Sequence, residues 1–194
     1  MHSLIITAHP SKKGFTHRIA NHYKKAVQEN GNTAKILNLY DDQWHQEFLN
    51  FESILEIESD DVRDEIQRQI SKADELIFVF PIWWGDAPAI MKNFFDTNFL
   101  TTFAFKYDGS GKEIGLLEGK KARMFMTCDN YGFLYKHFII RLPWLWGMGR
   151  LGFCGIKLIS MDILSQKRTR SSAELDRFLK LVEKRAIDKK RYIF

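Results

Sequence analysis

The sequence is poor in the residues that mark several classes of protein. It has two cysteines in 194 residues, Cys128 and Cys154, with no C-x-x-C spacing and no His or carboxylate cluster that has metal-ligand spacing. The most apolar stretch, residues 133–153, is interrupted by basic residues and a proline. We therefore expect a protein of a reducing compartment, without a metal site or a membrane-spanning helix.

The charge and the N-terminus exclude further classes of protein. Lys and Arg total 29 against 24 Asp and Glu, but apart from the run 184–191 the basic residues are scattered. No basic and aromatic pattern matches a nucleic-acid-binding module. The N-terminus lacks the basic start and apolar run of a signal peptide. We expect a soluble, cytoplasmic protein with no nucleic-acid partner and some attraction for phosphorylated small molecules.

Apolar runs alternate with helical patterns along the chain. Runs that are apolar on both faces are typical of strands inside a sheet covered on both sides, and alternation with helices predicts a mostly parallel, doubly wound α/β fold in one domain, 1–194. A hairpin is expected at 103–121, a long loop at 41–60, and a cover over a ligand or a partner surface at 130–153. The predicted strands are 4–8, 34–39, 75–80, 122–127 and 156–163, and the predicted helices are 16–29, 61–72, 88–99 and 172–186.

The first loop of interest follows the first predicted strand. Ligands of doubly wound sheets lie beyond the carboxyl ends of the strands, which selects the loops 9–16, 81–88 and 127–132. The first has neither glycine fingerprint of a dinucleotide or P-loop site, but its hydroxyl, imidazole and ammonium donors suit a phosphate. The alternative is that Ser11 or Thr16 only caps the helix and the lysines are solvated.

The second loop, after the third predicted strand, has the sequence PIWWGDAP. Two indoles beside a Gly turn suit a flat heteroaromatic ring that stacks on one side and is hydrogen-bonded at its edge. The alternative for Trp83 or Trp84 alone is a core or interface position. Hydrolase chemistry is not favoured, since the one GxSxG-like stretch, 109–111, lies in a turn.

Four segments together resemble one known family. TAHPSKKGFTHRIA (7–20), FVFPIWWGDAPAIMKNFFD (78–96), FKYDGSGKEIGLLEGKKA (105–122) and FCGIK (153–157) are similar in order and content to the flavodoxin-like NAD(P)H:quinone oxidoreductases. The resemblance spans nearly the whole chain. It implies a flavodoxin-like five-stranded parallel sheet with helices on both faces, a bound flavin, a homodimer, and reduction of quinones by NAD(P)H.

The resemblance also assigns cofactor-binding residues in this chain. It implies that the first loop surrounds the flavin phosphate and that the second follows the ribityl chain and the isoalloxazine edge. The family's Thr-Thr-Gly-Gly loop is replaced here at 127–130, where an acidic residue at 129 is expected to repel the anionic reduced flavin or shift its potential. The residues so assigned are His9, Ser11, Phe15, Thr16, Pro81, Ile82, Trp83, Trp84, Gly85, Thr127, Cys128, Asp129 and Asn130.

Tyr135 is the predicted catalytic residue. It lies at the spacing of the family's Tyr, and a phenol can donate to the flavin edge where negative charge develops on reduction. An exposed or core tyrosine is the alternative. The family's downstream His position is occupied by Arg141, and His137 is either a substitute or a surface histidine on a short helix.

The predicted function is a flavin-dependent NAD(P)H dehydrogenase (quinone). FMN is favoured, because the chain carries no C-terminal extension for an adenosine, but FAD stays open, since FAD-binding members of the resembled family hold the adenine in the same cleft. The alternatives are a flavin-binding regulatory or electron-carrier subunit, such as those ancillary to potassium-efflux systems, and a flavin-free structural partner. NADH against NADPH and the physiological acceptor stay open.

Overall fold

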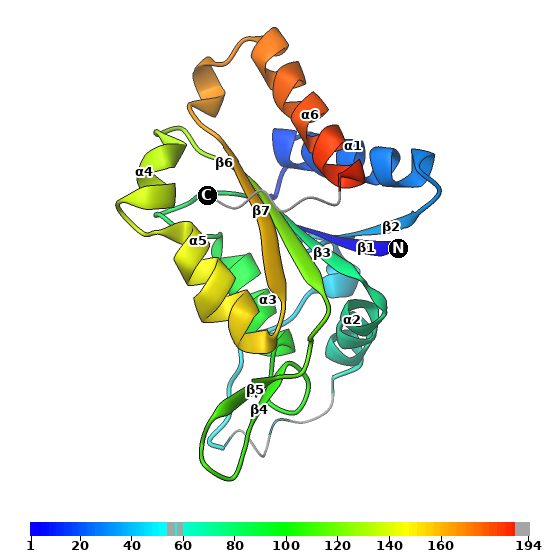
Figure 1. Cartoon of the computed structure of the whole chain (residues 1–194), viewed down its shortest axis with the longest axis vertical. Helices are drawn as coiled ribbons and strands as arrows, with labels where there is room; N and C mark the ends of the chain where they lie inside the picture. Colours follow the sequence, from blue (N-terminus) through cyan, green and yellow to red (C-terminus); the bar gives the residue numbers. More distant parts are fainter. Residues whose placement is uncertain (54–56, 58–59, 189–194) are drawn as a thin grey trace.

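The computed structural model describes residues 1–53, 57 and 60–188. Within these residues, five parallel strands form one sheet in the order β2-β1-β3-β6-β7 (Figure 1). The predicted doubly wound sheet is confirmed. The strands are β1 His2–Thr7, β2 Thr33–Asn38, β3 Glu75–Pro81, β6 Lys121–Thr127 and β7 Lys157–Leu164.

Helices cover both faces of the sheet (Figure 1). On one face α1 and α6 pack against Ile5, Ile77 and Phe125. On the other face α2, α3 and the segment after β6 pack against Leu4, Phe78 and their neighbours. Successive strand residues point to opposite faces, so a strand buried on both sides is apolar throughout. The long helices are α1 Phe15–Glu29, α2 Asp61–Lys72, α3 Ala89–Asn98 and α6 Ser172–Ile187.

Helix boundaries follow local capping chemistry. Asp60 accepts hydrogen bonds from the backbone N–H groups of Val62 and Arg63, which starts α2. Ser171 and Glu174 form a capping box that starts α6. The predicted helices agree with these elements to within one residue at each end.

The two long connections have their own structure. The predicted hairpin is present as β4 Phe105–Tyr107 paired antiparallel with β5 Glu113–Gly115. After β2, the loop forms the short helix η1 Asp42–Trp44, and Gln46 is then held against α3 by Asn93 and Asn98. Residues 54–56 and 58–59 of the predicted 41–60 loop lie outside the described residues, and so do residues 189–191 of the basic run 184–191.

The segment 130–153 is helical, although its apolar residues have no regular period. Its first helix begins where Gly132 packs so closely on β7 that a Cβ would lie 2.6 Å from Ile163 Cγ2. Trp146 in η3, a π-helix, is 1% exposed and packs on Phe78 and Phe80. The elements are α4 Gly132–His137, α5 Leu142–Trp144, η3 Leu145–Leu151 and η4 Gly152–Cys154.

The described residues form neither a membrane-spanning helix nor a metal-binding cluster. No helix among them is long and apolar enough to cross a membrane. No group of three or more His, Cys, Asp or Glu side chains within 1–53, 57 and 60–188 is placed to hold a metal ion.

Candidate functional site

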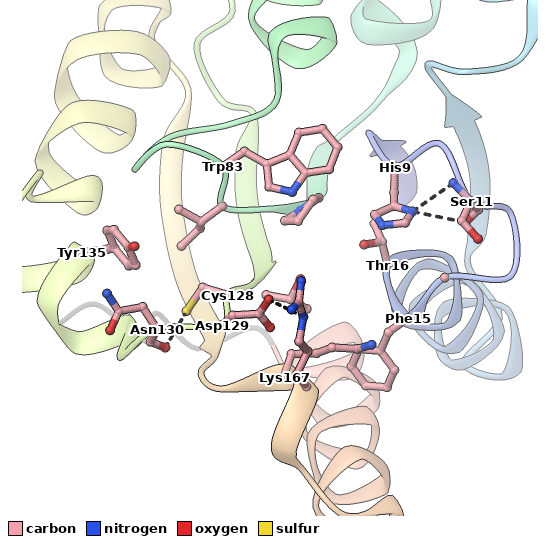
Figure 2. A pocket seen from close by; sticks show the side chains of 15 residues that line it. His9, Ser11, Phe15, Thr16, Trp83, Cys128, Asp129, Asn130, Tyr135 and Lys167 are labelled. Carbon is pink, nitrogen blue, oxygen red and sulfur yellow. Dashed lines mark hydrogen bonds and ion pairs between the residues drawn. The ribbon is translucent and has the colours of Figure 1, made fainter.

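A cleft of about 720 Å³ lies at the carboxyl ends of β1, β3 and β6. Figure 2 shows Trp83 on one side and Asp129 and Lys167 on the other, with His9 and Tyr135 at opposite ends. The size is that of a small-molecule or cofactor site. The lining residues are His9, Ser11, Gly14, Phe15, Thr16, Pro81, Ile82, Trp83, Thr127, Cys128, Asp129, Asn130, Tyr135, Lys167 and Arg168.

The cleft thus brings together all the predicted site residues except Trp84 and Gly85. These two form the tip of a tight turn in which Trp83 and Asp86 exchange backbone hydrogen bonds of 2.9 and 3.1 Å. Trp84 has a φ of 51° and Gly85 a φ of 87°, and the Trp84 side chain is fully exposed. The tightness of the turn was expected, whereas the position of the Trp84 side chain outside the cleft was not.

The loop after β1 leaves donors free for an anion. The N-cap of α1 is Gly14, and among the described residues neither the Ser11 nor the Thr16 hydroxyl makes a capping bond, so the alternative that Ser11 or Thr16 merely caps the helix does not describe this structure. The first N–H groups of α1 therefore keep their donor capacity and the positive end of the helix dipole faces the cleft. A Cβ on Gly14 would lie 2.9 Å from both His9 Nδ1 and the Ser11 carbonyl oxygen, so the loop is closed tightly around a bare glycine.

His9 is held in one orientation. The Ser11 N–H donates to His9 Nδ1 at 3.1 Å, and His17 Nε2 donates to the His9 carbonyl at 3.0 Å. Nδ1 also lies 3.3 Å from the Ser11 carbonyl oxygen, so both contacts with Ser11 fall on this nitrogen and Nε2 is the ring nitrogen that can contact a ligand. The ring also lies 6.4 Å from the Trp83 ring, centroid to centroid, which places the two loops side by side. The Lys12 side chain is exposed, as the alternative of solvated lysines has it, and its Nζ pairs with Asp41 at 2.9 Å.

The loop after β6 presents neutral groups and one carboxylate. Burial raises the pKa of the Cys128 thiol, which donates to the Asn130 carbonyl and stays protonated at neutral pH. Asp129 Oδ2 lies 3.0 Å from Arg168 Nε. Tyr135 in α4 is half-buried, and within the described residues its hydroxyl makes no hydrogen bond. His137 is exposed and is not among the lining residues.

Sequence reasoning missed Lys167 and Arg168. Both follow β7, the edge strand, whose carboxyl end was not among the selected loops. The rule that ligands lie beyond the carboxyl ends of the strands would also have selected this loop, because the sequence QKRTR follows the apolar run of β7.

A second network fixes the turn after β3. Arg150 of η3 makes two hydrogen bonds to Asp86, at 3.0 and 2.5 Å, and Trp146 Nε1 donates to Asp86 at 3.0 Å. The Arg150 guanidinium also lies over the Trp146 ring. Burial alone would raise the pKa of Asp86, but the hydrogen bonds and charge of Arg150 outweigh burial and lower it. The segment 130–153 therefore holds the Trp83 wall in place.

Asp86→Asn is expected to destabilise the fold in a pH-dependent way. A lowered folded-state pKa contributes stability above the unfolded pKa of about 3.9, and this contribution is lost as the pH falls through the folded value. We expect a loss of roughly 1–3 kcal/mol at pH 7, the range for a hydrogen-bonded charge. Urea unfolding of Asp86→Asn and wild type at pH 7 and pH 3 measures it. The gap should narrow at pH 3, and a constant gap would contradict the assignment.

Comparisons with known proteins agree with this geometry. Residues 1–185 match the model of a family described as having a flavodoxin-like fold. An uncharacterized NAD(P)H oxidoreductase of Haemophilus influenzae is 31% identical over 169 residues, which is 84% of this chain and 83% of that protein. An FMN-dependent NADH:quinone oxidoreductase of Coprothermobacter proteolyticus is 34% identical over 137 residues, which is 64% of this chain and 66% of that one.

Two further similarities differ in extent. The human ribosyldihydronicotinamide dehydrogenase [quinone] is 34% identical, but the match spans 53% of this chain and only 46% of that protein. The structure of an NAD(P)H:quinone oxidoreductase from Methanothermobacter marburgensis superposes with a TM-score of 0.80 at 25% identity, covering 96% of this chain and 95% of that one. The chain belongs to the flavodoxin-like family that includes these NAD(P)H:quinone oxidoreductases.

Proposed function

We propose that this chain is a flavin-dependent NAD(P)H:quinone oxidoreductase with FMN as its cofactor. One observation carries the proposal: the α1 N-terminus, an indole wall and a phenol that makes no hydrogen bond within the described residues line the same cleft. The names of the relatives point in the same direction. When bound, FMN supplies hydride transfer between the nicotinamide donor and the quinone.

The residues present fit such a group. His9 Nε2, the Ser11 hydroxyl and the first amides of α1 would hold the phosphate. Phe15, Thr16 and Thr127 would complete that end, while Pro81, Ile82 and the Trp83 indole would lie along the ribityl chain and ring. Cys128 and Asn130 would position the loop at the ring edge. The tight backbone of Gly85 would shape the same wall from behind.

Tyr135 is proposed to donate its phenolic proton to the ring edge where negative charge develops. Because its hydroxyl is not committed to another group in the described residues, it can turn toward that edge. Tyr135→Phe keeps the ring and removes the donor. We expect kcat/KM for menadione reduction to fall about tenfold, within the range for loss of one hydrogen bond to a charged group. The FMN dissociation constant should change less than threefold, and unchanged turnover would remove Tyr135 from the mechanism.

The first experiment is the visible spectrum of the purified protein. Absorption near the flavin bands, or its appearance on adding FMN, supports the proposal, and a colourless protein that binds neither FMN nor FAD refutes it. Mass spectrometry of the released cofactor then distinguishes FMN from FAD. Steady-state oxidation of NADH and NADPH with menadione separates an enzyme from a flavin-binding regulatory subunit, which would show little turnover with any acceptor.

We further propose that the chain forms a homodimer in the cytoplasm, with 1–194 as one flavin-binding domain per subunit. Between residues 131 and 148 a group of large apolar side chains is more than half exposed, and that stretch contains no acidic residue. Trp84 is exposed as well. The exposed side chains are Tyr131, Phe133, Phe138, Ile139, Trp144 and Met148. Light scattering should give twice the mass of 22.8 kDa, and Phe138→Asp should yield monomers.

A further inference from the structure

The loop after β7 is built to carry two cations into the cleft. Gln166 has a φ of 53°, its N–H donates to the Asn130 carbonyl at 3.2 Å, and the Lys167 N–H donates to the Cys128 carbonyl at 3.0 Å. These backbone bonds tie the loop to the one after β6. Lys167 and Arg168 therefore line the cleft from a fixed backbone, and Figure 2 shows Lys167 at the wall beside Asp129.

The charges inside the cleft are unequal. Of the lining residues, Lys167 and Arg168 carry the permanent positive charges and Asp129 carries the one carboxylate. Asp129 pairs with Arg168 alone among the residues that the structure describes. The cleft therefore keeps an excess of one positive charge at this wall, before any contribution from the α1 N-terminus.

The Asp129–Arg168 pair is weak enough to be displaced. The Arg168 side chain is 83% exposed and that of Asp129 is 53% exposed. An exposed ion pair contributes at most about 1 kcal/mol, whereas a phosphate offers a guanidinium two charges and a bidentate geometry. A phosphate in the cleft thus competes favourably with the Asp129 carboxylate for Arg168.

We propose that Lys167 and Arg168 form a second phosphate-binding wall of the cleft, and that Asp129 occupies Arg168 until a nucleotide phosphate replaces it. This rests on the proposed function for the identity of the nucleotide. The phosphate belongs either to the flavin nucleotide or to the nicotinamide dinucleotide, since both carry the same chemistry. Asp129 then tunes phosphate affinity, because its carboxylate both neutralises Arg168 and repels the incoming anion.

The test uses Arg168→Gln, Lys167→Gln and Asp129→Asn in the full chain, with Arg177→Gln as the control. Arg177 is exposed on α6 outside the cleft, so its substitution removes one positive charge from another part of the surface. Flavin fluorescence gives dissociation constants for FMN and riboflavin, and initial rates give kcat/KM for NADPH and NADH. The ratio of the FMN and riboflavin dissociation constants isolates the flavin phosphate, and the ratio of kcat/KM for NADPH and NADH isolates the 2′-phosphate of the donor.

If the flavin phosphate is bound, Arg168→Gln and Lys167→Gln each lower the preference for FMN over riboflavin by about fivefold, and Asp129→Asn raises it. If the 2′-phosphate of the donor is bound, the same pattern appears in the NADPH to NADH ratio, and if the pyrophosphate common to both donors is bound, kcat/KM falls about equally for NADPH and NADH relative to Arg177→Gln. Inorganic pyrophosphate, titrated calorimetrically, probes the wall without flavin, and Arg168→Gln should weaken it about fivefold. Pyrophosphate binding with no flavin binding would refute the proposed function but support the wall. If the ratios and the pyrophosphate affinity of the Arg168, Lys167 and Asp129 variants were all within twofold of those of Arg177→Gln, the proposed phosphate-binding wall would be refuted.

Discussion

Arg123→Met is expected to lower the free energy of unfolding by about 3–5 kcal/mol, because it leaves a buried carboxylate unpaired. Arg123 of β6 and Glu75 of β3 lie 2.8 Å apart, Nε to Oε1, and each side chain is 3% exposed. The Tyr23 hydroxyl donates to the other Glu75 oxygen at 2.7 Å. Burial and the neighbouring Glu75 charge raise the pKa of Tyr23, so the phenol remains a donor.

Urea unfolding measures this loss, and Tm should fall by roughly 10 °C for a chain of this size. The control is Arg68→Met, which breaks the exposed Arg68–Glu65 pair on α2 and should cost at most about 1 kcal/mol. The triple variant Tyr23→Phe/Glu75→Leu/Arg123→Met removes both buried charges and the phenol together, leaving the Ser160 hydroxyl and the Asp188 carbonyl that Arg123 also contacts, and should be more stable than Arg123→Met alone. If Arg123→Met were no less stable than Arg68→Met, the substitution would not have left Glu75 as an unpaired buried charge.

Gly14→Val is expected to weaken FMN binding roughly 100-fold, about the loss of one or two hydrogen bonds to a charged group. A Cβ at this position would lie 2.9 Å from the Ser11 carbonyl, which is backbone and cannot swing away as a side chain can. The loop must shift, and the branched side chain would fill the space beside His9. Riboflavin, which has no phosphate, should be affected much less.

Fluorescence titration with FMN and riboflavin measures both effects. Gly109→Val is the matched control, because a Cβ there meets nothing within 4 Å and the residue lies in the hairpin turn far from the cleft. Circular dichroism establishes that both variants are folded. If Gly14→Val bound FMN as tightly as Gly109→Val, the phosphate would not lie in the loop after β1.

The predicted strands and long helices were confirmed because their signals are local. A strand buried on both faces needs an unbroken apolar run, as at Leu76 to Phe80 in β3, and a helix start needs a cap such as Ser171 with Glu174. The loops 9–16 and 127–132 could also be selected, because parallel strands bring their carboxyl ends to one edge. Whether the residues in them bind a cofactor stays a prediction.

Other features depended on contacts between distant parts of the chain. The segment 130–153 is helical because Trp146 and Leu142 bury themselves on the sheet and Asp86 binds Arg150, 64 residues away. No periodicity in its own residues encodes that. The turn at Trp84 likewise follows from backbone pairing between Trp83 and Asp86, which turns the Trp84 side chain to solvent.

The sequence alone determined a five-stranded parallel sheet and the edge at which its loops meet. An unbroken apolar run indicates a strand buried on two faces, and alternation of strands with helices indicates parallel strands. Only the tertiary structure decided which side chains share that edge. Asp129 meets Arg168, and Glu75 meets Arg123, through strand order and register, and these pairings depend on the positions of residues that are far apart in the chain.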